Sequence, residues 1–213
     1  MNWESDGYEL KVFERSYIRN EDYYFLPGLT WSVRTASGFS PRVLPAGCTF
    51  SHSGDAIICH NTDDTVQLLG VLMSRTVAYM VELLVASGDA AVSGSAARSY
   101  EVGVVQSIPL PPELSEGGKD IGPIVREVWR KFRVQDAESE TSKYFQIPSI
   151  LTAAKKAGKA PLVTLAEYAK RQSEDRALSI LALTKTIERT VQDLYGLEDS
   201  TINSIQEEMG KHP

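Results

Sequence analysis

The chain has 213 residues, of which 42% are hydrophobic and 23% charged, and its formal net charge is −6. That size allows one large domain or two small ones. The acidic balance argues against a freestanding nucleic-acid binder, because phosphate contacts need clustered Lys and Arg, but it does not exclude a local basic patch. The N-terminus does not read as a signal peptide, there are two cysteines, and no apolar run reaches the roughly 18 residues of a membrane span, so we expect a cytoplasmic protein without membrane contact.

The N-terminal stretch reads as strands and turns. Apolar and polar residues alternate over Tyr8–Phe13 and again over Thr30–Thr35, where Trp31 and Val33 share a face. This alternation predicts half-buried strands. A short apolar run, Ala56–Cys59, predicts a buried strand. We therefore expect a mixed sheet here, with Gly and Pro marking its turns.

Helical periodicity follows. Apolar residues at spacings of three and four predict one helix from Val66 to about Ala86, and Asp63–Thr65 supply candidate N-caps. The apolar positions in Val102–Ile108 then predict a last strand, which ends at the prolines of Pro109–Pro112.

The C-terminal part is predicted to be helical. Helices are expected over Ile121–Val134, within Tyr144–Ala157, and from a capping-box pattern at Thr164 to about Tyr195. Gly196 is a natural residue to follow the long helix, and a last short helix should run toward Met209. The fold class is therefore α+β, with an α/β part in residues 1–114 and a helical C-terminal region in residues 115–213.

The chain lacks the motifs of several catalytic classes. It has no Gly-rich turn after a first strand to hold adenosylmethionine, and no Walker A loop. It also lacks the Asn/Asp-Pro-Pro-aromatic tetrad of amino-methylating enzymes. Its one Pro-Pro pair, Pro111 and Pro112, lies between Leu110 and Glu113 and does not fit that motif. We expect no catalytic residue and no cofactor in this chain.

Two clusters invite other interpretations. Cys48, His52, Cys59 and His60 could suggest zinc, but their spacings match no usual array, and neighbours on a strand point to opposite faces. The segment Ser51–Asp55 has the residue types of a hydrolytic triad, yet it is typical of a turn. An independent hydrolase stays as a minor hypothesis.

Four segments, in order, resemble known proteins. The first runs from Phe25–Ser32 through Gly38–Ser40, and the second is Leu68–Ser74, with Met73 where Asn is usual. Both resemble the C-terminal half of large adenine-specific DNA methyltransferases of the type IIG restriction-modification and BREX-type phage-exclusion families. The C-terminal Val191–Leu197 also resembles the tail of these enzymes. Tyr100 through Pro112 resembles the end of target-recognition domains in type I specificity subunits.

The resemblance implies that residues 1–114 form a target-recognition-like domain. Its partners would be double-stranded DNA and a catalytic domain that this chain lacks, with S-adenosylmethionine expected for the full enzyme. Guanine is commonly read by Arg, and Ser and Thr contact phosphate. The DNA-binding candidates are Thr30, Ser32, Arg34, Thr35, Ser37, Ser40, Arg42, Arg75 and Arg98. The alternative is a protein-interaction subunit of such a complex without direct DNA contact, which the acidic charge favours. Trp31 is expected in the core rather than on a base-stacking surface.

Overall fold

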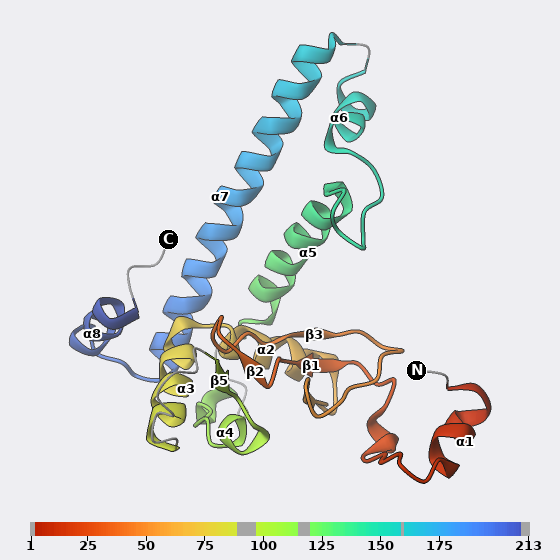
Figure 1. Ribbon diagram of the computed structural model, residues 1–213. Helices are drawn as coiled ribbons and strands as arrows, with labels where there is room; N and C mark the ends of the chain where they lie inside the picture. Colours follow the sequence, from red (N-terminus) through yellow and green to blue (C-terminus); the bar gives the residue numbers. More distant parts are fainter. Residues whose placement is uncertain (1–2, 89–96, 115–119, 159, 210–213) are drawn as a thin grey trace.

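The computed structural model describes residues 3–88, 97–114, 120–158 and 160–209 (Figure 1). The helices are α1 (Glu4–Val12), α2 (Thr62–Leu72), α3 (Arg75–Gly88), α4 (Val102–Gln106), α5 (Gly122–Glu138), α6 (Ser149–Ala157), α7 (Leu162–Leu194) and α8 (Asp199–Met209). The strands are β1 (Gly28–Thr30), β2 (Arg34–Thr35), β3 (Arg42–Leu44), β4 (Ala56–Ile57) and β5 (Arg98–Ser99). Two 3-10 turns, η1 (Glu21–Tyr23) and η2 (Pro112–Leu114), complete the set. The α+β class is confirmed.

The strands form two small sheets. β1 lies between β3 and β4, and β2 pairs with β5. Each of these strand pairs is antiparallel, so the sheets are not mixed as the sequence predicts. Gly28 allows the close approach of β1 and β4, because a Cβ at this position would collide with the carbonyl oxygen of Ile57. The single strand predicted over Thr30–Thr35 is instead divided between the two sheets.

The strand predicted over Tyr8–Phe13 is wrong, since most of this segment belongs to α1. Its alternating side chains have no sheet to cover, and Tyr8 and Val12 are 63% and 59% exposed. The segment is held instead by polar contacts, among them the ion pair between Lys11 and Asp6 at 2.8 Å.

The helix predicted from Val66 to Ala86 is broken into α2 and α3, which bend by 72° relative to each other. Ser74 lies at the break, and its Oγ accepts from the backbone N–H of Val77 at 3.1 Å, so it caps α3. At the other end, α2 is capped by Asn61, two residues before the first predicted cap, and its side chain accepts from the backbone N–H of Asp64 at 2.8 Å.

The strand predicted over Val102–Ile108 is also wrong. This segment forms α4, and Val104, Val105 and Ile108 pack against the core. A spacing of four between Val104 and Ile108 suits one helical turn as well as it suits a strand, so a short run cannot separate the two.

The predicted C-terminal helices are confirmed, although α7 begins at Leu162 after Pro161 rather than at a capping box on Thr164. With 33 residues, α7 is about 50 Å long, and it rises from the rest of the molecule with α5 and α6 beside it (Figure 1). Gly196 has a φ of +61° and ends α7 in a Schellman motif, with N–H groups of Gly196 and Leu197 bonded to Asp193 and Gln192.

One hydrophobic core joins the base of the long helices to the sheet and to α2 and α3. It includes Leu29 and Trp31 from the N-terminal part, Val71 from α2, and Ile187 and Val191 from α7. The boundary predicted between residues 114 and 115 therefore crosses a shared core, and the division into two domains stays a prediction.

Within the described ranges, no single helix is both long and apolar enough to cross a bilayer. Among the helices that the structure describes, one pair, α2 and α3, reaches the required length and composition when the two are taken together, and the sharp bend between them interrupts that stretch. Val71, Val77 and Val81 of this pair are fully buried in the protein core.

Candidate nucleic-acid interface

The segment from Thr30 to Arg42 presents polar side chains on a rigid base. Thr30 and Arg42 are directly opposite each other in β1 and β3, so they share a face of the sheet. The Arg42 guanidinium donates to Ser32 Oγ at 3.2 Å, and Thr30 Oγ1 donates to the Asp55 carbonyl at 2.8 Å. Arg42 remains exposed, whereas Thr30 is partly buried.

The structure brings Arg98 beside this segment. In the β2–β5 ribbon Arg34 pairs with Ser99, and Thr35 pairs with Arg98. Because neighbouring residues on a strand point to opposite faces, Arg34 and Arg98 lie on opposite sides of the ribbon. The Arg98 side chain is 56% exposed and lies against the Glu82 carboxylate.

Buried aromatic residues support the β2–β5 ribbon. Trp31 is 1% exposed, which confirms its place in the core, and its Nε1 donates to the Tyr100 carbonyl at 2.7 Å. Tyr100 is fully buried and its backbone N–H donates to Val33. Phe39 packs against both rings, at centroid distances of 6.2 and 5.7 Å. The exposed polar residues therefore stand on a fixed support.

The remaining candidates of this segment lie on its turn. Ser37 and Ser40 are exposed, and the backbone N–H of Ser37 donates to Thr35 Oγ1 at 3.0 Å. Gly38 between them has a φ of +85°, a left-handed conformation that favours glycine. A Cβ at Gly38 would meet no atom within 4 Å, so the backbone here is open to a ligand.

Arg75 is the one predicted residue that lies apart from the others. Its guanidinium donates to the Met209 carbonyl at 2.7 Å, which ties the end of α8 to the start of α3. This contact gives Arg75 a structural role, and its contact with DNA stays a prediction.

A groove that the sequence did not reveal lies beside the larger sheet. Its volume is about 440 Å³, and residues of β1, β3, α2 and α5 are among those that line it. Its floor is apolar, with Leu29, Val43 and Leu69 among the lining residues, and Trp129 and Arg130 stand at its α5 side.

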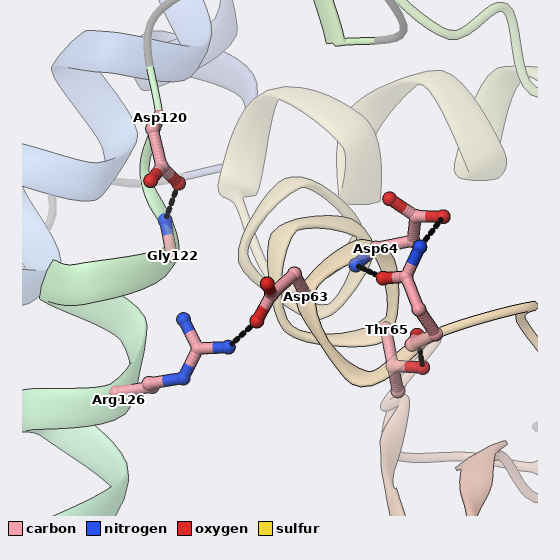
Figure 2. Close-up of polar contacts among 7 residues, drawn as sticks. Asp63, Asp64, Thr65, Asp120, Gly122 and Arg126 are labelled. Atoms are coloured by element: carbon pink, nitrogen blue, oxygen red, sulfur yellow. Dashed lines mark hydrogen bonds and ion pairs between the residues drawn. The ribbon is translucent and has the colours of Figure 1, made fainter. Parts of the chain in front are cut away.

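Polar contacts hold the two helices that form this groove (Figure 2). Arg126 of α5 pairs with the Asp63 carboxylate at the start of α2. The carboxylate of Asp120 accepts from the N–H of Gly122 at 2.8 Å, at the start of α5. The first contact joins α5 to α2 and engages Arg126 within the protein, whereas the second is local to the start of α5.

The two alternative clusters are placed as follows. Ser51, His52 and Ser53 are exposed on a turn, in which the N–H of Gly54 donates to the Ser51 carbonyl. Burial raises the pKa of the Asp55 carboxyl, an effect that the charge of His52 opposes. In the part of the chain that the structure describes, no group of three or more His, Cys, Asp and Glu could hold a metal ion.

Comparison with known proteins gives a partial match. No protein-family model matches the chain. Over 86 residues, or 39% of its length, it is 36% identical to the adenine-specific methyltransferase BrxX of Escherichia coli O9:H4 (strain HS). Over 190 residues, or 87% of its length, it is 25% identical to the adenine-specific methyltransferase PglX of Lacticaseibacillus casei (strain Zhang).

These matches cover only 7% and 14% of the two relatives. The chain is therefore weakly homologous to a small part of adenine-specific methyltransferases.

Proposed function

We propose that this chain is a DNA sequence-recognition module of an adenine-specific (N6) DNA methyltransferase in a restriction-modification or phage-defence system. In this proposal it lacks the catalytic domain, and methyl transfer from S-adenosylmethionine takes place in that other domain. The role of this chain is to contact double-stranded DNA and to hold it while the adenine is turned out of the stack.

The observation that carries the proposal is the pairing of β2 with β5. It gathers Arg34, Thr35, Arg98 and Ser99 on one ribbon, although the two strands are far apart in sequence. A two-stranded β-ribbon fits the major groove of B-DNA, and Arg is the usual reader of guanine there. The buried Trp31 fixes the ribbon in place, as a site that must read bases requires.

A protein-interaction subunit is the second candidate function. The net charge of −6 favours it, and so do exposed apolar side chains near the junction of α6 and α7. Leu162 and Val163 are 71% and 69% exposed, and Leu151 of α6 is 52% exposed. An exposed apolar group of this kind suits contact with another protein.

Duplex binding separates the two candidates. We expect fluorescence anisotropy with a labelled duplex to detect binding at low salt that weakens as salt is raised. The double variant Arg34→Ala/Arg42→Ala should weaken this binding, and each lost phosphate contact should lower the salt slope by about 0.9. Arg98→Ala should also weaken binding.

The matched control is Arg171→Ala/Arg189→Ala, which removes the same number of charges from exposed positions on α7. It should leave duplex binding unchanged. Binding that the Arg34 and Arg42 substitutions do not affect would contradict the site. Failure to bind any duplex, even when the catalytic fragment is added, would favour the protein-interaction function.

A further inference from the structure

One face of α5 combines cations with a half-exposed aromatic ring. Arg126, Trp129, Arg130 and Arg133 are spaced by three and four residues, so they lie along one side of the helix. The opposite side carries Ile124 and Val128, which pack against the core. We call these four residues the α5 stripe.

The rings and cations of the α5 stripe contact one another. The Arg133 guanidinium lies 6.0 Å from the centroid of Trp129 and 4.3 Å from that of Tyr144. Lys143 lies 5.0 Å from the Tyr144 centroid. Trp129 is 49% exposed and Tyr144 is 36% exposed, so both rings keep a surface for another partner.

The local charge is opposite to that of the whole chain. Residues 122–134 contain four cations and one carboxylate, although the net charge of the chain is −6. Arg126 is engaged with Asp63, but Arg130 is 69% exposed, and its ion pair with Glu127 at 3.6 Å is an exposed contact of the weak kind. The stripe therefore offers positive charge to a polyanion.

The apolar groove adjoins this stripe. Trp129 and Arg130 line it together with Leu26 and Val43, and its volume of about 440 Å³ leaves room beside the indole ring. A flat, partly apolar group could lie against Trp129 there while an anionic group reaches Arg130.

We propose that the α5 stripe binds a single-stranded nucleic acid, with phosphates on Arg130 and Arg133 and a base stacked on Trp129. Proteins that hold single strands use this combination of a basic track and exposed aromatic rings. A duplex fits less well, because its paired bases do not offer their faces to a side chain. This contact is separate from the ribbon of Arg34 and Arg98, and it does not depend on the duplex recognition proposed above.

The test uses the full chain and a fluorescein-labelled single strand of twelve thymidine nucleotides, called dT12 below. We expect saturable binding that quenches the fluorescence of Trp129 in a Trp3→Phe background, since Trp31 is buried. Trp129→Ala should weaken binding by about tenfold, and Trp129→Phe should restore most of it, because phenylalanine still offers an aromatic face. The double variant Arg130→Ala/Arg133→Ala should lower the salt slope by about 0.7 for each lost phosphate contact.

The matched control is Arg171→Ala/Arg189→Ala, which removes two exposed arginines from α7. It should bind dT12 as the parent chain does. An abasic strand of the same length should bind about tenfold more weakly than dT12, because it has phosphates without bases to stack. Thermal unfolding of each variant, followed by circular dichroism, checks that it is folded.

Three results would overturn the proposal. The first is equal affinity for dT12 and the abasic strand, which would reduce the stripe to a general polyanion site. The second is an equal loss of binding in the α7 control. The third is the absence of dT12 binding at low salt. The Arg34→Ala/Arg42→Ala variant should keep its dT12 binding, so the failure of either proposal can be told from the failure of the other.

Discussion

Glu188 is a buried carboxylate that α7 supplies to the start of α3. It accepts from the backbone N–H groups of Arg75 at 2.7 Å and Thr76 at 3.2 Å, and from Thr76 Oγ1 at 2.7 Å. Gln192 donates to the same carboxylate at 3.1 Å. A negative charge at this position satisfies N–H groups that a helix start leaves without partners, and it also complements the helix dipole.

Replacement of Glu188 by Ala should therefore destabilise the protein. It would leave buried N–H groups at the start of α3 without an acceptor, at a cost of about 2–3 kcal/mol in the free energy of unfolding. Urea unfolding followed by circular dichroism measures this change. Glu167→Ala removes an exposed carboxylate from the same helix and is the control. A loss no larger than that of the control would contradict the capping role.

Tyr195 gives the stability a dependence on alkaline pH. Its hydroxyl donates to the Pro109 carbonyl at 2.7 Å, and burial raises its pKa to about 12. The folded state therefore keeps its proton at a pH where the unfolded chain, with a pKa near 10, has lost it. The unfolded state then binds fewer protons, so the free energy of unfolding falls as the pH rises from about 10 to 12.

Comparison with Tyr195→Phe isolates this effect. The variant lacks the hydroxyl, so it should be less stable than the parent chain by about 1 kcal/mol at neutral pH. That difference should shrink as the pH rises from about 10 to 12, because only the parent chain has this group to titrate. Urea unfolding at a series of pH values measures it. A difference that stays constant over that range would count against the raised pKa.

At the scale of elements, the contact between α2 and α5 depends on a glycine. A Cβ at Gly70 would lie 2.5 Å from Val125 Cγ2 and 2.8 Å from Ile121 Cδ1. Val125 is buried and β-branched, so it has little freedom to move away. The two helices can approach this closely only without a side chain at position 70.

Gly70→Ala should destabilise the protein by about 1–2 kcal/mol, since overpacking outweighs the gain in helix propensity. Val125→Ala removes the methyl group that the new side chain would meet. The double variant Gly70→Ala/Val125→Ala should therefore lose less stability than the sum of the two single variants. Gly103→Ala, in α4, is the matched control, because a Cβ there meets no atom within 4 Å. Additive losses in the double variant would contradict the close contact.

The same elements show what the sequence could predict. The helices α5 and α7 could be found because their apolar periodicity is long and local. The break between α2 and α3 could not, because the carboxylate that accepts from Arg75 lies 113 residues further along the chain. Short segments such as α4 could not be assigned from the sequence, because a few residues fit a strand and a helical turn equally well.

The candidate site could likewise be predicted only in part from the sequence. Arg34 and Arg42 could be proposed from the residue types of one segment. Arg98 lies on the same β2–β5 ribbon as Arg34 because of a long-range strand pairing, which a single sequence does not display. The α5 stripe did have a local signal, namely Arg and Trp at spacings of three and four, but only its place beside the groove gives that pattern a functional meaning.

At the scale of the whole molecule, the shared core makes the two predicted parts depend on each other. Val191 of α7 is fully buried in one cluster with Leu29 and Trp31 of the N-terminal part. The base of α7 is therefore part of the support on which the β2–β5 ribbon stands. Loss of packing at Val191 should therefore destabilise the β2–β5 ribbon, although the two are distant in sequence.

Val191→Ala should lower the stability of the whole chain by about 2–3 kcal/mol, from lost burial and from the cavity it leaves. Urea unfolding can be followed by far-ultraviolet circular dichroism, which reports mainly the helices, and by the fluorescence of Trp31 in a Trp3→Phe/Trp129→Phe background. The two transitions should coincide, and Val191→Ala should shift both equally. Leu178→Ala, at a position on α7 that is 65% exposed, should shift neither appreciably. If the Trp31 transition instead stayed in place while the helical signal moved, residues 1–114 would unfold as an independent domain.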